Sequence, residues 1–231
     1  MSSVESIARL GVVAAQQWGY VTTAQAQTQG VSRDRLSKLS RAGALEPVGH
    51  GVHRMAGVPA PAHEAIYVAY VSLRDRAEQV SGPGDTPPLV VSGHSAALLH
   101  DMGDYWPGAV EFFTRAPVRS SRTGVKLVRR ALQRRDVVWA SGLPTLSGNA
   151  TIRELVREGG DLSLVSSALM DGLQEGKIDL AELGETLDEV APMSGYSSGQ
   201  DLAEALLRGT PLPRSVQEWY LARLPLERAA A

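Results

Sequence analysis

The sequence contains no cysteine, which excludes disulfide bonds, thiol catalysis and zinc sites built from thiolates. It also lacks any apolar run near the roughly 18 residues that a membrane helix needs. The opening residues, MSSVESIARL, lack the order of basic and then apolar residues that marks a signal peptide. We therefore expect a soluble, cytoplasmic protein with no membrane segment and no structural metal.

The 231 residues suffice for two domains, each with a core of its own. Hydrophobic residues make up 43% and charged residues 21%, values that are ordinary for globular proteins and argue against wholesale disorder. Gly57, Pro59 and Pro61 interrupt regular structure. We therefore place a domain boundary there, between a first domain at 1–57 and a second at 58–231.

The formal net charge of −2 is unevenly distributed along the chain. Residues 1–56 hold six basic and three acidic side chains, and residues 112–135 hold eight basic and no acidic ones. Residues 151–231 hold seven basic against fourteen acidic side chains. Because binding surfaces respond to local charge, the two basic segments are the candidates for contact with a polyanion.

Three short helices are predicted near the start of the chain. Apolar residues at helical spacing predict the first helix over residues 4–18. Thr22 or Thr23 can cap a second helix, and Ser32 can cap a third that ends before Gly43. In the third helix the leucines fall on one side and most basic residues on the other.

Two extended runs follow, at residues 44–48 and 52–55, and glycines between them suit a tight hairpin turn. Three helices and a hairpin predict a winged helix-turn-helix, whose third helix enters the major groove of DNA. The residues expected to contact DNA are Thr23, Ser32, Arg33, Arg35, Ser37, Lys38, Arg41, His53 and Arg54. The alternatives are a solvated helix face and a protein-interaction module.

The segment GYVTTAQAQTQGVSRDRLSKLSRAGALEPVGHGVHRMAG resembles the N-terminal domain of AbiEi-type antitoxins of type IV toxin–antitoxin systems. The matching residues are Gly30, Val31, Ser32, Arg33, Leu36, Leu39, Gly43, Leu45, Gly51, Val52 and Arg54. His53 departs from the family, which commonly carries Tyr there. SGHSAALLHDMG resembles a second block of that family, at the start of its C-terminal domain. The stretch from Val110 to Leu155 resembles the block that follows it.

The resemblance implies a bacterial transcriptional autorepressor that is also an antitoxin. Its winged helix would bind repeats of double-stranded operator DNA in its own promoter, as a monomer or a weak dimer. Its second domain would counteract a nucleotidyltransferase-like toxin, with or without a direct complex.

The second domain is predicted to be mixed α/β, so the fold class is α+β: a winged helix-turn-helix, then a small sheet with a C-terminal helical layer. A helix is expected over residues 63–79, followed by a buried strand that turns into a helix at LVVSGHSAALLH. Strands are expected at residues 109–115, 125–132 and 136–144, and five helical patterns follow from Thr151.

A run of basic residues crosses the predicted strands. It forms either an accessory patch for DNA or RNA, or a set of intramolecular partners for the acidic C-terminal helices. Its members are Arg115, Arg119, Arg122, Lys126, Arg129, Arg130, Arg134 and Arg135.

No catalytic or metal-binding motif is recognisable. Ser92, His94, Ser95 and His100 lack a nucleophile elbow, so we expect Ser92 or Ser95 to cap a helix and the histidines to pack or hydrogen-bond locally. The three histidines between residues 50 and 63 have no common metal-ligand spacing. We therefore expect no enzymatic activity, no cofactor and no metal.

Two other functions are weighed against the antitoxin. A one-component regulator would sense a small ligand through an apolar pocket between the sheet and the helices. A nuclease would need convergent carboxylates for a metal, and no sequence motif indicates them.

Overall fold

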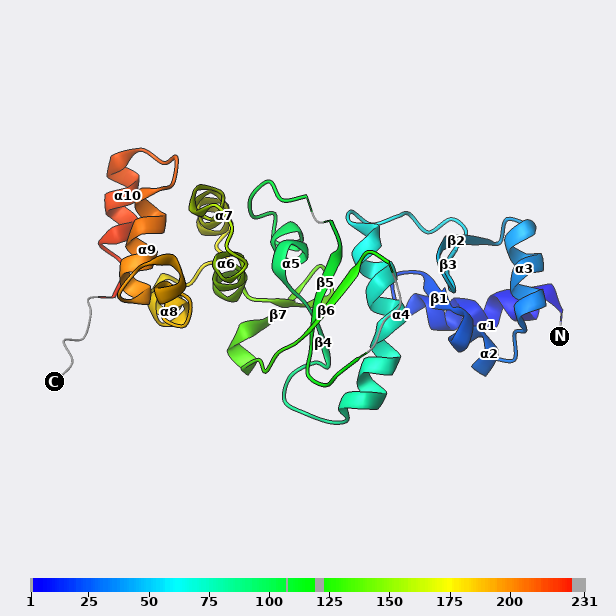
Figure 1. Ribbon diagram of the computed structural model, residues 1–231. Coiled ribbons are helices and arrows are strands. Elements are labelled where there is room, and N and C mark those ends of the chain that lie inside the picture. Colours follow the sequence, from blue (N-terminus) through cyan, green and yellow to red (C-terminus); the bar gives the residue numbers. More distant parts are fainter. Residues whose placement is uncertain (1, 107, 119–122, 226–231) are drawn as a thin grey trace. The chain divides into compact units, whose positions relative to one another are not determined.

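The computed structural model describes residues 2–106, 108–118 and 123–225. The chain divides into two compact units, Met1–Gly82 and Pro83–Ala231, each with a hydrophobic core. Both units combine helices with a sheet, so the fold is α+β, as the sequence predicts (Figure 1). Among the described residues, no helix is long and apolar enough to cross a membrane.

The first unit begins with three helices and a three-stranded antiparallel sheet of order β1-β3-β2. The elements are α1 (Ser3–Ala15), β1 (Tyr20–Thr22), α2 (Thr23–Thr28), α3 (Arg33–Arg41), β2 (Leu45–Gly49) and β3 (Val52–Met55). The caps follow the sequence prediction, because the hydroxyls of Thr22 and Ser32 accept backbone N–H groups at the starts of α2 and α3. Strand β1 was not predicted, and it pairs with β3 to add a third strand to the predicted hairpin.

Helix α4 (Glu64–Ser81) completes the first unit. The indole of Trp18 packs edge-on against Tyr67 and Tyr70 of this helix, with ring centroids 5.2 and 6.1 Å apart. The sequence placed the boundary between residues 57 and 58, before this helix. Glycine and proline do break regular structure there, but aromatic packing of the kind that dominates cores continues beyond the break, and the compact unit ends at Gly82.

The second unit contains a mixed five-stranded sheet of order β6-β5-β4-β8-β7. Its strands are β4 (Leu89–Val91), β5 (Val110–Thr114), β6 (Val125–Arg129), β7 (Val137–Ala140) and β8 (Leu143–Leu146). The expected single strand at residues 136–144 is instead a hairpin of β7 and β8. The reason is a two-residue turn at Ser141 and Gly142, both with positive φ, which reverses the chain.

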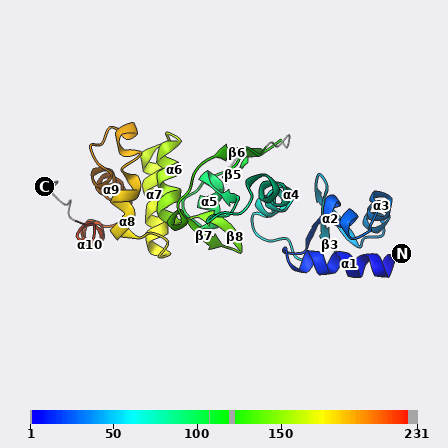
Figure 2. The same ribbon diagram turned by 90° about the horizontal axis from the view of Figure 1, so that it is seen from below.

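Helices surround and extend this sheet. They are α5 (Gly93–Leu99), α6 (Gly148–Arg157), α7 (Leu162–Gln174), α8 (Leu180–Leu187), α9 (Gly199–Arg208) and α10 (Arg214–Leu221), with short 3₁₀ turns at Arg134–Asp136 and Ala191–Ser194. The five helices predicted from Thr151 onward correspond to α6 to α10. Figure 2 shows α6 and α7 beside the sheet and α8 to α10 beyond them. The buried leucines of α6 to α9 form one apolar core with Ala97 and Met102.

Candidate nucleic-acid interface

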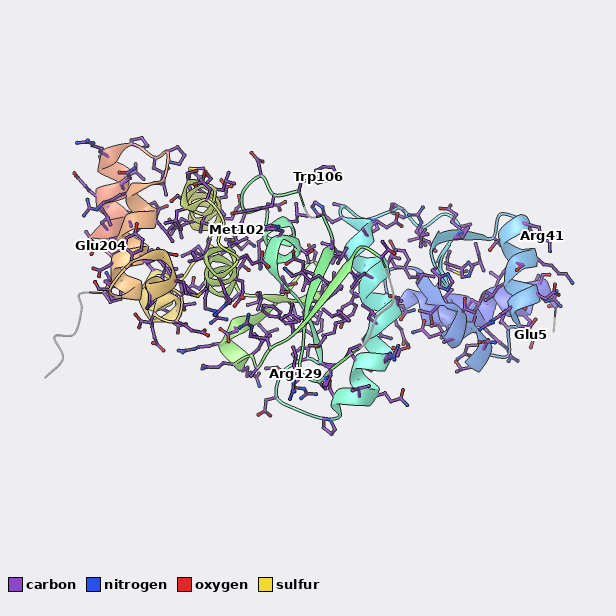
Figure 3. The ribbon with its side chains drawn as sticks, viewed as in Figure 1. Glu5, Arg41, Met102, Trp106, Arg129 and Glu204 are labelled. Carbon is purple, nitrogen blue, oxygen red and sulfur yellow. The ribbon has the colours of Figure 1, made fainter. Side chains whose placement is uncertain are left out.

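Helix α3 separates its apolar and basic residues as its spacing predicts. Leu36 and Leu39 are buried in the core of the first unit together with Val31. The residues on the opposite side are exposed, and Figure 3 labels Arg41 among them. The exposed residues predicted to contact DNA are Arg33, Ser37, Lys38 and Arg41, and the acidic Asp34 is exposed on the same helix. The helix therefore presents basic and hydroxyl groups to the surroundings, a composition suited to phosphates and base edges.

A hollow of about 350 Å³ lies between α3, the start of α2 and the turn of the hairpin. Its lining residues are Thr23, Arg33, Leu36, Ser37, His50, Gly51 and His53. The fold thus brings together four of the predicted contact residues from three separate elements. It also adds His50, which sequence reasoning missed because a turn histidine carries no periodic signal.

The charges on α3 are partly compensated within the helix. Lys38 pairs with Asp34 at 2.8 Å, one turn earlier, and this lysine holds the pKa of Asp34 below its ordinary value. Arg35 is half-buried and donates to the hydroxyl of Ser3 in α1 at 3.4 Å. The side chains of Lys38 and Asp34 are both exposed, so a phosphate can take the place of the Asp34 carboxylate beside Lys38.

His53 and Arg54, the two hairpin residues predicted to contact DNA, are not exposed cations. Burial lowers the pKa of His53, so its imidazole is neutral at pH 7 and offers hydrogen bonds in place of charge. Arg54 pairs with Glu46 and, at 2.5 Å, with Glu64 of α4. Its side chain is 13% exposed, so the guanidinium ties the sheet to α4. Arg54 therefore serves a structural contact within the first unit.

Three of the six described members of the basic run in the second unit are paired internally. Lys126, Arg130 and Arg135 each form an ion pair with a glutamate of the second unit. Arg115 is half-buried and Arg134 is exposed. Arg129, at the end of β6, is also exposed and is labelled in Figure 3. The two remaining predicted members, Arg119 and Arg122, lie outside the described residues.

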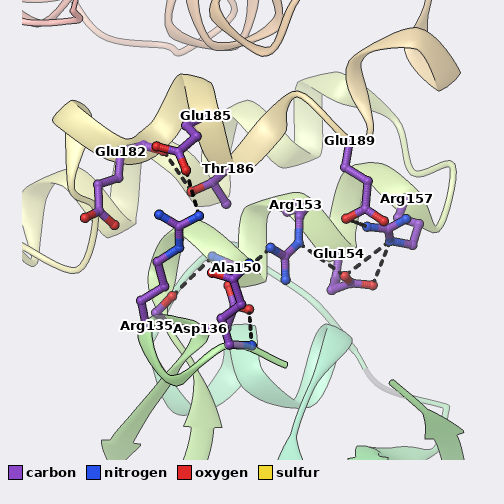
Figure 4. Close-up of polar contacts among 12 residues, drawn as sticks. Arg135, Asp136, Ala150, Arg153, Glu154, Arg157, Glu182, Glu185, Thr186 and Glu189 are labelled. Carbon is purple, nitrogen blue, oxygen red and sulfur yellow. Dashed lines mark hydrogen bonds and ion pairs between the residues drawn. The ribbon is translucent and has the colours of Figure 1, made fainter. Parts of the chain in front are cut away.

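Glu154 of α6 is the centre of a compact ionic network. This carboxylate is 4% exposed and lies near Arg130, Arg153 and Arg157, with N–O distances of 3.2 to 3.5 Å. Figure 4 shows how the network continues to Asp136 on one side and to Glu189 on the other. Burying one acid among several guanidiniums satisfies its charge, which an isolated buried carboxylate could not do.

A second polar cluster lies where α5, β5, β6 and the end of α6 meet. Lys126 contacts Glu158 at 2.7 Å and Glu111 at 3.6 Å, and His94 lies 3.7 Å from Glu158. Burial, and next to it the charge of Glu158, raises the pKa of Glu111 to about 7. The sequence could not indicate this cluster, because its members are separated by 15 residues or more, without a shared motif.

The first unit has the basic helix and the adjoining hairpin of a DNA-binding type of domain. Residues 13–56 match the family described as a transcriptional regulator, AbiEi antitoxin. The match confirms the resemblance of this N-terminal segment to AbiEi-type antitoxins, a family described as transcriptional regulators. No curated protein matches the chain.

Proposed function

We propose that this protein is a DNA-binding antitoxin of a type IV toxin–antitoxin system that represses its own operon through a winged helix-turn-helix. The observation that carries the proposal is the hollow between α3 and the hairpin, lined by Thr23, Arg33, Ser37 and His53. In a winged helix of this kind, α3 reads the major groove and the hairpin touches the adjacent backbone. The family match over the same residues supports this assignment.

Binding to the DNA upstream of its own gene, measured across a salt series, tests the proposal. The Arg33→Ala, Lys38→Ala, Arg41→Ala triple variant should bind more weakly, and the slope of log affinity against log salt should fall by up to about 3, one unit for each lost phosphate contact. The Lys177→Ala, Arg208→Ala, Arg214→Ala variant is the matched control. It removes the same charge from exposed sites of the second unit and should bind like the wild type.

Two results would contradict the assignment. If the wild-type protein failed to bind this DNA even at low salt, the first unit would be a protein-interaction module. If both triple variants lost affinity equally, binding would reflect total charge and not the α3 surface. For the antitoxin activity, co-expression with a neighbouring nucleotidyltransferase-like toxin should restore growth, and loss of rescue on deleting the second unit would assign that activity to it.

A one-component regulator is the second candidate. It requires an apolar ligand pocket in the second unit. The hollow of about 200 Å³ beside η1 (Arg134–Asp136) and α8 is lined mainly by charged and polar residues, among them Asp136, Lys177 and Glu182. This lining suits an ionic contact better than an apolar effector, so we favour the antitoxin.

A further inference from the structure

We propose that His94, Glu111 and Glu158 form a binding site for a divalent transition-metal ion, best matched by Zn²⁺, which takes the place of the Lys126 ammonium. This site lies in the second unit, separate from the proposed DNA-binding surface, and it is independent of that function. It also changes the expectation from the sequence, in which no metal ligands could be recognised.

The positions of the donor atoms support the site. One imidazole nitrogen and one oxygen from each carboxylate all lie within 4.8 Å of one another. Ligand atoms around a tetrahedral Zn²⁺ are about 3.4 Å apart, given metal–ligand bonds near 2.1 Å. The 3.7 Å between His94 Nε2 and Glu158 Oε2 already approaches this spacing, and small side-chain rotations would close the rest.

The donor chemistry selects the class of ion. Imidazole nitrogen is a common ligand of Zn²⁺ and is unusual for Mg²⁺, which prefers six oxygens. One imidazole and two carboxylates leave a fourth position open for water. The charge also fits, because one ammonium compensates only one of the two carboxylates, whereas a divalent cation compensates both.

The surroundings hold these donors in place. The Glu111 N–H donates to Ser95 Oγ at 3.0 Å, and the Glu111 carbonyl accepts from the Ser92 N–H at 3.0 Å. The imidazole of His94 stacks on Tyr105, with ring centroids 4.7 Å apart. A Cβ at position 93 would lie 1.8 Å from Glu111 Oε2, so glycine is what allows the carboxylate to approach the start of α5. The SGHS segment thus arranges the donors of the cluster.

An ion can reach the site from solvent. The side chains of His94 and Glu158 are 34% and 28% exposed, whereas that of Glu111 is 10% exposed. The lysine that now lies between the carboxylates is 47% exposed and can swing outward. The site therefore has one sheltered ligand and two at its mouth.

Calorimetric titration of the chelator-treated full chain with ZnCl₂, and in parallel with MgCl₂, tests the site. Saturable binding of one Zn²⁺, at least about tenfold weaker in Glu111→Gln and Glu158→Gln, with weaker Mg²⁺ binding, is the expected result. His63→Ala combined with Glu175→Gln removes a comparable set of exposed donors and should leave the affinity unchanged. His94→Ala, at the exposed mouth, replaces the Glu111 variant if that variant does not fold.

The Lys126→Met variant distinguishes a metal site from a cluster that only stabilises the fold. Removing the competing ammonium should strengthen Zn²⁺ binding several-fold, and an unchanged or lower affinity would overturn the proposed exchange of lysine for metal. The absence of saturable Zn²⁺ binding in the wild type, or undiminished binding in the two glutamine variants, would overturn the site itself.

Discussion

The hydroxyl of Tyr20 in β1 donates a 2.9 Å hydrogen bond to the carboxylate of Glu64, the first residue of α4. Tyr20 is fully buried, and burial followed by the effect of Glu64 raises its pKa. The same carboxylate binds Arg54 of β3. One acidic side chain therefore joins two strands of the small sheet to a helix that lies beyond the predicted domain boundary.

Replacing Tyr20 by Phe should lower the free energy of unfolding by about 0.5–1.5 kcal/mol, because the hydrogen bond is lost while the ring packing is kept. Urea denaturation measures this change. Tyr196→Phe is the control, since in the described part of the chain its hydroxyl has no partner, and it should cost less than about 0.5 kcal/mol. Equal losses in the two variants would show that the Tyr20–Glu64 bond contributes nothing specific.

Replacing Asp34 by Asn should strengthen DNA binding about two- to fivefold at moderate salt, because Lys38 loses its competing carboxylate and α3 gains positive potential. Fluorescence anisotropy with upstream DNA gives the affinity. Glu204→Gln is the matched control, because Glu204 and Arg208 form the same exposed pair one turn apart on α9. An increase in both variants would indicate a response to net charge alone.

Replacing Gly199 by Ala should destabilise the fold by more than about 2 kcal/mol, because the new Cβ would overlap backbone that has little room to move. That Cβ would lie 2.1 Å from the carbonyl oxygen of Gly184 and 2.4 Å from the amide nitrogen of Asp188, in and next to α8. Gly11 of α1 is the contrasting helical glycine, because a Cβ there would meet no described atom within 4 Å beyond its own stretch of helix. Gly11→Ala should stabilise by up to about 1 kcal/mol through helix propensity. Thermal and urea unfolding measure both, and a mild effect at Gly199 would contradict the close helix contact.

Acidification should destabilise the protein in part through His100. This side chain is buried, its Nε2–H donates to the Leu146 carbonyl at 2.6 Å, and burial lowers its pKa below the ordinary 6.5. The unfolded chain therefore takes up a proton at a higher pH than the folded chain does. Stability from the neutral imidazole is present above about pH 6.5 and is lost as the pH falls toward the folded pKa.

The His100→Gln variant keeps a donor for the Leu146 carbonyl but cannot titrate. Its melting temperature should fall less than that of the wild type between pH 7.5 and 5.5, and the difference between the two curves isolates His100. The exposed His63→Asn variant should retain the wild-type profile. Parallel curves for wild type and His100→Gln would remove His100 from the acid response.

Much of the first unit could be predicted because its signals are local. Ser32 caps α3, Leu36 and Leu39 recur at helical spacing, and glycines mark the hairpin turn. Strand β1 could not be predicted, because three residues show no alternation and its partner β3 lies far along the chain. The role of Arg54 escaped prediction for the same reason, since its partner Glu64 follows the predicted boundary.

In the second unit, strand and helix patterns predicted the elements, but not how their charges meet. The sequence leaves two alternatives for the basic run, a nucleic-acid patch or internal pairing. In the structure, Lys126, Arg130 and Arg135 pair with Glu158, Glu154 and Glu185, respectively. The cluster around Glu111 likewise depends on sheet register and on where α6 ends. Such contacts are set by tertiary structure, which leaves no periodic trace in the sequence.

The internal pairing of the second unit changes how a polyanion encounters this molecule. Residues 1–82 carry eight basic and six acidic side chains, whereas residues 83–231 carry fifteen basic and nineteen acidic ones. With Lys126, Arg130 and Arg135 paired from within, we expect the second unit, with its net negative charge, to repel a nucleic acid within the screening length and the first unit to attract it. If the proposed function holds, DNA should therefore approach by the first unit, before any specific contact with α3 forms.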